Sequence, residues 1–145
     1  MIAIGADHAG FEYKEKMKDL LRSMELEFQD YGTTSSESTD YPDYAHRVAE
    51  SVSTGKAEYG ILFCGTGIGM AIVANKHNGV RASNVESAEA AKLAREHNDV
   101  NVLAIGARLT SWEKAKEIIK TFLNTKFEGG RHRRRVEKIH TLTNL

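Results

Sequence analysis

The residue best suited to chemistry in this chain is its single cysteine, Cys64. It ends a short apolar segment and is followed at once by the glycine-rich stretch Gly65–Gly69. Backbone N–H groups in such a stretch are unhindered and bind anions where a helix begins. A helix start also favours the thiolate form of a neighbouring cysteine, so Cys64 is a candidate base or nucleophile. A free cysteine is also often a small buried hydrophobic residue, and its position alone leaves both interpretations open.

The glycine-rich stretch has a second interpretation as a nucleotide site. Its spacing is Gly65-x-Gly67-x-Gly69 rather than Gly-x-Gly-x-x-Gly, and it follows the third predicted strand instead of the first. The lysine of a phosphate-binding P-loop is absent as well. A non-catalytic, flavodoxin-like nucleotide-binding module is therefore a remote alternative, and tight turns without a ligand are the simplest structural interpretation.

Two pairs of polar residues lie near predicted element ends. Asp7 and His8 follow the first predicted strand, and ligands of parallel sheets bind at the carboxyl ends of strands. His97 and Asn98 lie at the end of a predicted helix, where a histidine often only complements the helix dipole. Position therefore favours function for His8 more than for His97.

The most basic segment begins at Arg131 and contains three further arginines by Arg135. A nucleic-acid surface is one interpretation, but the segment has no interleaved aromatic residues and the whole chain is neutral. On a helix, Arg131 and Arg135 share one face, and two guanidinium groups on one face suit a single phosphate. Arg133 and Arg134 would then point elsewhere, toward solvent.

Short apolar segments alternate with longer segments of helical period along the chain, which is typical of βαβ proteins. The predicted strands are Ile2–Gly5, Leu26–Asp30, Tyr59–Cys64, Val80–Val85 and Asn101–Ile105. The predicted helices are Gly10–Met24, a segment that Pro42 opens and Gly55 ends, a segment from the glycine-rich stretch to Lys76, Ser87–His97, Ser111–Asn124 and Arg131–Leu142.

This pattern predicts an α/β fold, a Rossmann-like three-layer αβα sandwich with about five parallel strands and a C-terminal helix. We expect the strand order 2-1-3-4-5. In that order the first and third strands are neighbours, so the loops after Asp7 and Cys64 flank the point where the strand order reverses.

Length and composition indicate one globular domain spanning residues 1–145. The chain is 41% hydrophobic, and its lone cysteine has no partner for an internal disulfide, which suits a reducing compartment. The formal net charge is +0, and no apolar run approaches the roughly 20 residues of a membrane-spanning helix. We therefore expect a cytoplasmic protein with no nucleic-acid and no membrane partner.

Six segments together resemble the type B ribose-5-phosphate isomerases, a family that also includes galactose-6-phosphate isomerase subunits. The segments follow the family's order across nearly the whole chain, and the set is specific although each segment alone is weak. They are Gly5–Gly10, Asp40–Pro42, Cys64–Gly69, Ala74–Lys76, Arg95–Asn98 and Gly129–His132. The resemblance implies an aldose–ketose isomerase that interconverts D-ribose 5-phosphate and D-ribulose 5-phosphate through an enediolate, with no cofactor and no metal.

The resemblance also implies catalytic roles. Cys64 is the implied base that moves a proton between C1 and C2. Family members without this cysteine use a glutamate at the position that Met70 occupies here. His97 is implied to assist opening of the furanose ring, and Asn98 to contact the reacting oxygens.

The remaining implied roles concern substrate binding. Asp7 and His8 would hold the sugar, with His8 close to the phosphate. The phosphate itself would be held by Arg108, Arg131 and Arg135. The anion hole for the enediolate would consist of the backbone amides of Gly65, Thr66, Gly67, Ile68 and Gly69.

A different phosphosugar substrate is the nearest alternative. Allose 6-phosphate or galactose 6-phosphate would need a similar proton transfer and similar phosphate contacts. Galactose-6-phosphate isomerase is associated with two different subunits that share one site. This chain carries the cysteine, the histidines and the arginines itself, which favours a self-sufficient enzyme.

The predicted topology separates the candidate residues within one chain. Cys64 ends a strand at the carboxyl edge of the sheet, whereas His97 and Asn98 precede a strand at the amino edge. A helix of about eleven residues is roughly 16 Å long, too far for one histidine side chain to cross. We therefore expect a homodimer, or a dimer of dimers, in which each active site takes residues from two chains.

Overall fold

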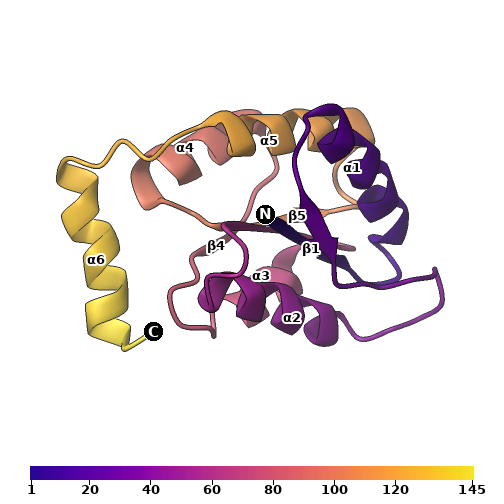
Figure 1. The fold of residues 1–145 in the computed structure, drawn as a ribbon, viewed down its shortest axis with the longest axis horizontal. Helices are drawn as coiled ribbons and strands as arrows, with labels where there is room; N and C mark the ends of the chain where they lie inside the picture. The colour runs from indigo at the N-terminus through magenta and orange to yellow at the C-terminus, as the bar shows by residue number, and fades with distance from the viewer.

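The computed structural model describes all residues, 1–145, as five parallel strands that alternate with helices (Figure 1). The strands are β1 (Ile2–Ala6), β2 (Phe28–Asp30), β3 (Tyr59–Cys64), β4 (Ala82–Asn84) and β5 (Val102–Gly106). The helices are α1 (Phe11–Ser23), α2 (Tyr41–Ser53), α3 (Ile68–Ala74), α4 (Ala88–Asn98), α5 (Trp112–Asn124) and α6 (Arg131–Thr143). The predicted α/β fold is confirmed, and none of its helices combines the length and the apolarity needed to cross a bilayer.

The strand order is β2-β1-β3-β5-β4, so the predicted order was wrong for the last two strands. The reason lies in their burial. Every residue of β5 is buried, and this strand therefore takes the central place beside β3. The three residues of β4 are only half-buried, which suits the edge of the sheet. The predicted pairing of the first and third strands is confirmed by the register of Ile4 with Ile61.

Side chains alternate between the two faces of the sheet, as the pleat requires. In β3, Ile61 and Phe63 pack with α1, α4 and α5, whereas Leu62 and Cys64 pack with α2 and α3. Figure 1 shows these two groups of helices on opposite sides of the sheet. Cys64 therefore lies on the α2 and α3 side, at the carboxyl end of its strand.

Local signals explain several element ends. The side chains of Ser87 and Ser111 accept hydrogen bonds from backbone N–H groups in the first turns of α4 and α5, as helix N-caps do. Pro42 lies in the first turn of α2, where its missing N–H group has no consequence.

Helix α6 stands apart from the sandwich at one end of the molecule (Figure 1). The chain enters it through Gly130, whose φ of 53° favours glycine because it has no Cβ. Only His132 and Val136 of this helix are buried. His140 is half-buried, and the other residues of α6 are exposed and include the arginine-rich segment.

Candidate active site

A pocket of about 400 Å³ opens at the carboxyl ends of β1 and β3, where the strand order reverses. Its wall includes seven of the predicted site residues together with Tyr41 and Ile72. The residues are Asp7, Tyr41, Cys64, Gly65, Thr66, Ile68, Gly69, Ile72 and Arg108. We call this set the cysteine half of the site.

The thiol of Cys64 is held by the glycine loop. The side chain is 5% exposed, and its Sγ accepts a hydrogen bond of 3.1 Å from the backbone N–H of Gly67. Gly67 has a φ of 80°, and a Cβ at this position would lie 2.4 Å from Nδ2 of Asn84. Glycine is therefore required here both by conformation and by space. Met70, at the position of the alternative glutamate, is fully buried.

Asn84 holds the other side of the loop and was not among the predicted site residues. Its Nδ2 donates hydrogen bonds to the carbonyl oxygens of Thr66, at 3.1 Å, and Ala104, at 3.3 Å. The hydroxyl of Thr66 accepts the N–H of Ile68 at 3.2 Å. Its position at the carboxyl end of a predicted strand, the edge where ligands of parallel sheets bind, was the available signal for Asn84.

The loop after β1 supplies a buried carboxylate. Oδ1 of Asp7 accepts hydrogen bonds from the N–H groups of Ala9 and Gly10, at 2.9 and 3.2 Å. His8 is half-buried and lies outside the pocket wall. Its Nδ1 accepts the N–H of Thr39 at 3.1 Å, so its Nε2 is left for a ligand.

Two side chains pack on the glycines of the loop. A Cβ on Gly65 would lie 3.0 Å from the Arg108 guanidinium, and a Cβ on Gly69 would lie 2.6 Å from the ring of Tyr41. The missing side chains therefore let Arg108 and Tyr41 approach the loop backbone. Tyr41 was part of the resembling segments but was not predicted as a site residue.

Four of the predicted residues lie on helices that do not contribute to this pocket. His97 and Asn98 end α4, and Arg131 and Arg135 lie on α6; no residue of either helix lines the pocket of Cys64. We call these four residues the histidine half of the site. Asn98 instead lines a separate hollow with Val80 and other residues of the amino edge.

A contact between the histidine half and a neighbouring residue of α6 was not predicted. The rings of His97 and His132 stack with centroids 4.3 Å apart and planes inclined by 14°. Nε2 of His132 lies 3.5 Å from a carboxylate oxygen of Glu128. Sequence spacing shows the His132 and Glu128 pair, but only the path of α6 brings it against α4.

One potential ligand atom from each of His97, Glu128 and His132 lies within 4.8 Å of the other two, the arrangement of a candidate metal site. A tetrahedral zinc ion with bonds of about 2.0–2.1 Å needs lone pairs that converge on one point. The lone pairs of an imidazole lie in its ring plane, and these two planes are nearly parallel. As arranged, the two rings do not direct their lone pairs at one point, so the group does not suit a tetrahedral metal ion.

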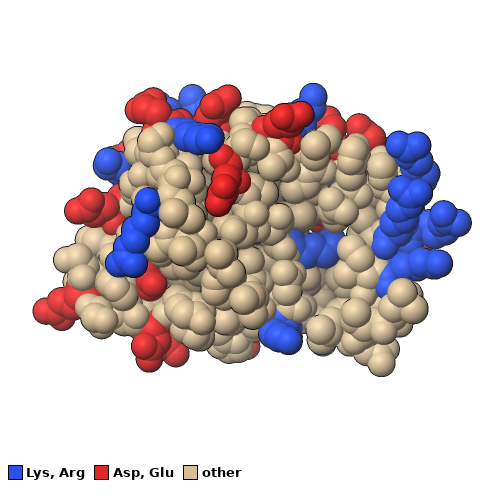
Figure 2. All heavy atoms as spheres, turned by 180° about the vertical axis from the view of Figure 1, so that it is seen from behind, with Lys and Arg blue, Asp and Glu red and all other residues tan.

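Basic side chains gather over α6, which forms the outer edge of the molecule on the right of Figure 2. Arg131, Arg133, Arg134 and Arg135 are all exposed. The guanidinium of Arg133 lies over the ring of Phe127, 5.6 Å from its centroid. Arg133 therefore packs on its own chain rather than pointing only to solvent.

The fold and the pocket define a parallel α/β protein with a small-ligand site at the reversal of its strand order. Residues 2–139 match the family model described as Ribose/Galactose Isomerase. The chain belongs to that family.

Individual relatives agree with this assignment. The chain is 49% identical over 138 residues to ribose-5-phosphate isomerase B of Escherichia coli, covering 95% of this chain and 93% of that protein. The solved ribose-5-phosphate isomerase B of Clostridium thermocellum is 43% identical with a TM-score of 0.97, covering 99% of this chain and 97% of that one. The enzyme of Mycoplasma genitalium, solved with bound ribulose 5-phosphate, is 38% identical with a TM-score of 0.95, covering 99% and 95%.

Proposed function

We propose that this chain is an aldose–ketose isomerase that interconverts D-ribose 5-phosphate and D-ribulose 5-phosphate. The observation that carries the proposal is the pocket in which a buried thiol, loop amides, a carboxylate and a guanidinium come together. The names of the similar proteins support the same reaction. Because the proposed base must remain a reduced thiol, we also propose that the enzyme works in the cytoplasm.

The reaction begins with opening of the furanose ring. In the proposal, His97 assists by moving a proton from the anomeric hydroxyl to the ring oxygen as the bond between C1 and that oxygen breaks. Asn98 contacts the oxygens that change. The product of this step is the open-chain aldehyde.

The isomerisation itself is a proton transfer. The thiolate of Cys64 removes the proton from C2 of the aldose, and negative charge develops on the oxygen at C1. The amides of Gly65–Gly69 stabilise this enediolate, an effect often worth several kcal/mol in preorganised sites. The hydroxyl proton at C2 passes to the oxygen at C1, and return of the carbon-bound proton to C1 then gives the ketose.

The phosphate provides binding energy that orients the sugar. Arg108 lies in the pocket wall of the same chain, and in the proposal His8 joins it at the phosphate through Nε2, since its Nδ1 is already bonded to Thr39. Arg131 and Arg135 complete the phosphate site in the proposal. Asp7 holds the sugar hydroxyls through the carboxylate that lines the pocket.

We propose that two chains build each site. The cysteine half is surrounded by apolar side chains that a monomer would leave in water, since Ile68, Ile72 and Leu109 are 53%, 58% and 61% exposed. Such patches mark contacts with another protein. A two-fold dimer would cover this surface and bring the histidine half of one chain to the cysteine half of the other.

The reaction is tested by assaying purified protein, after exhaustive chelation, with ribose 5-phosphate, allose 6-phosphate and galactose 6-phosphate. We expect full activity without metal and the highest kcat/KM for the pentose phosphate. A higher kcat/KM for a hexose phosphate would contradict the substrate, and loss of activity on chelation would contradict metal independence.

The shared site is tested by mixing chains that carry Cys64→Ala with chains that carry His97→Ala. Each variant alone is expected to be nearly inactive. A mixed dimer has one intact site of two and should recover up to about half of the wild-type activity per dimer. Hybrids that form, as verified by mass, but recover no activity would contradict the shared site.

A further inference from the structure

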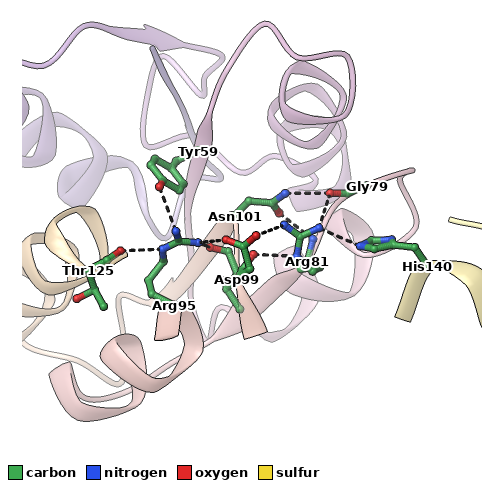
Figure 3. A network of polar contacts seen from close by, with 9 residues as sticks. Tyr59, Gly79, Arg81, Arg95, Asp99, Asn101, Thr125 and His140 are labelled. Atoms are coloured by element: carbon green, nitrogen blue, oxygen red, sulfur yellow. Dashed lines mark hydrogen bonds and ion pairs between the residues drawn. The ribbon is translucent and has the colours of Figure 1, made fainter. Parts of the chain in front are cut away.

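Asp99 follows the last residue of α4 and lies at the centre of the polar network in Figure 3. Its Oδ1 accepts a hydrogen bond of 2.9 Å from Arg95, and its Oδ2 lies 3.3 Å from Arg81. Its backbone carbonyl accepts Nε of Arg81 at 2.8 Å. Asp99 has a φ of 48°, a left-handed conformation that aspartate adopts at some energetic cost. The two arginines therefore hold both the side chain and the backbone of this residue.

Arg95 connects this residue to the segment that leads to α6. Its side chain is almost fully buried and donates to the carbonyl oxygens of Val100, at 2.6 Å, and Thr125, at 3.1 Å. A third bond of 3.2 Å reaches the hydroxyl of Tyr59. Figure 3 shows the guanidinium of Arg95 between its acceptors Tyr59, Asp99 and Thr125, the last of which follows α5.

Arg81 connects the same carboxylate to α6 itself. Its Nη1 lies 2.9 Å from Nε2 of His140, near the C-terminal end of α6. Through Arg95 and Arg81, Asp99 is thus linked to Thr125 and to His140, which lie on either side of Arg131 and Arg135 in the chain. It also lies two residues after His97.

The charge of Asp99 is essential to this arrangement. Burial lowers the pKa of the Arg81 guanidinium, Asp99 opposes that shift, and the charge of Arg95 adds to it. Without the carboxylate, two guanidinium groups would face each other in a partly buried site. One or both would have to move, and the end of α4 would move with them.

We propose that Asp99 is the positioning residue of the histidine half, fixing His97 and α6 through Arg81 and Arg95 without touching substrate. This inference rests on the function proposed above. One ion network at the amino edge of the sheet, opposite the edge where Cys64 lies, thus sets the geometry of half of the active site.

The test places Asp99→Asn in one chain or the other of the active hybrid of Cys64→Ala and His97→Ala chains. The intact site of that hybrid takes its histidine half from the Cys64→Ala chain. In that chain, Asp99→Asn should lower kcat about 10- to 100-fold, since a misplacement of about 1 Å can cost 100-fold. In the His97→Ala chain it should leave the hybrid's activity unchanged, because that chain's histidine half is already inactive.

Stability alone would not produce this asymmetry, because both hybrids contain one substituted chain. Equal losses in the two placements would overturn the proposal. The matched control is Asp19→Asn, which removes a surface carboxylate 3.1 Å from Arg22 and should change neither placement. If the hybrid of Cys64→Ala and His97→Ala chains is inactive even with Asp99 intact in both, the shared site of the proposed function is contradicted instead.

A second measurement does not depend on activity. In wild-type protein and in the Asp99→Asn variant, the imidazole signals of the histidines are compared by NMR. We expect the signals of the stacked His97 and His132 to shift while that of His46, which contacts His77 and belongs to neither half, does not. Unchanged signals of His97 and His132 would overturn the proposal whatever the assay gives.

Discussion

The two halves of the proposed site are built in different ways. The cysteine half consists largely of backbone and buried groups, with the thiol of Cys64 held by the N–H of Gly67. The histidine half consists of side chains at a helix end and on the exposed helix α6, held by a network of charges around Asp99. The first half is therefore preorganised by the packing of the sheet, and the second by ion pairs.

This difference predicts how each half fails. A residue of the cysteine half has little room to move, so a substitution there changes the chemistry or the local packing. A residue of the histidine half depends on charges at a distance, and substitutions there change binding and orientation.

The largest effect is expected for Cys64→Ala, which removes the proposed base while leaving a small apolar side chain in its place. We expect kcat to fall by about two to four orders of magnitude, as is typical of a positioned acid or base, with the fold retained. Steady-state kinetics measure the fall in kcat, and circular dichroism shows whether the fold is retained. Thiol alkylation should inactivate the wild type, and bound substrate should protect it. Turnover near the wild-type rate would show that another group is the base.

A smaller loss is expected for Gly67→Ala, which tests whether the glycine loop is as rigid as its packing indicates. The new Cβ would lie 2.9 Å from the backbone carbon of Ile105, so the loop must shift and the contact to Cys64 is disturbed. We expect kcat to fall about 10- to 100-fold.

The matched control for this change is Gly55→Ala. Gly55 also has a positive φ, 78°, but a Cβ there would contact nothing within 4 Å. Both substitutions carry a conformational strain of roughly 1–2 kcal/mol, and only the first should reduce kcat. Equal kcat values for the two variants would show that the loop tolerates displacement.

The arginines of α6 test the histidine half. We expect Arg131→Ala or Arg135→Ala to weaken the binding of substrate and of free phosphate about 10- to 100-fold, the range for a lost charge-assisted hydrogen bond. Calorimetric titration with phosphate and the value of KM measure this. Arg131→Lys should restore binding only in part, because an ammonium group cannot form two parallel bonds.

Arg133→Ala and Arg134→Ala are the controls on the same helix. Arg133 packs over Phe127 rather than sharing the face of the first pair. We expect both controls to bind phosphate as the wild type does. Equal weakening in all four variants would indicate a diffuse basic surface instead of a phosphate site.

The sequence predicted the fold well where periodicity and burial coincide. The helix predicted at Ser111–Asn124 is observed at Trp112–Asn124, and the strand Tyr59–Cys64 has the predicted bounds. The order of the last two strands was missed because the prediction followed chain order, although Arg81, Ser83 and Asn84 make Val80–Val85 the more polar of the two. The apolar strand β5 is fully buried in the centre of the sheet, and β4 lies half-buried at its edge.

The site was predictable in its cysteine half, because Cys64 and the glycine loop are contiguous in sequence. The partners of the histidine half were not predictable. Arg81, Arg95 and Asp99 come together only because β4 takes the edge of the sheet and the chain after α5 returns past α4. These contacts join residues that are distant in sequence, and no local sequence pattern predicts how the segments that carry them pack together.

The smallest effect on activity is expected for Asp30→Asn, which probes a second aspartate held by two cations. Oδ2 of Asp30 lies 2.6 Å from Lys14 and 2.7 Å from Lys18, and Lys14 is 1% exposed. None of these three residues lines the pocket of Cys64, so kcat should not change, in contrast to Asp99→Asn. The free energy of unfolding should fall by roughly 1–3 kcal/mol near neutral pH, less than for a fully buried pair because Glu15 still pairs with Lys14.

The loss of stability in Asp30→Asn should also depend on pH. Burial by itself would raise the pKa of Asp30, but the hydrogen bonds from Lys14 and Lys18 outweigh it, and the pKa lies below its ordinary value of 3.8. A lowered folded-state pKa stabilises the protein above pH 3.8, and this contribution disappears as the pH falls through the folded-state value. Urea unfolding should therefore separate wild type from variant at pH 7 and bring them together at strongly acidic pH. A difference that is the same at both pH values would show that the ion pairs of Asp30 do not stabilise the fold, and a fall in kcat would show that charge networks position the cysteine half as well.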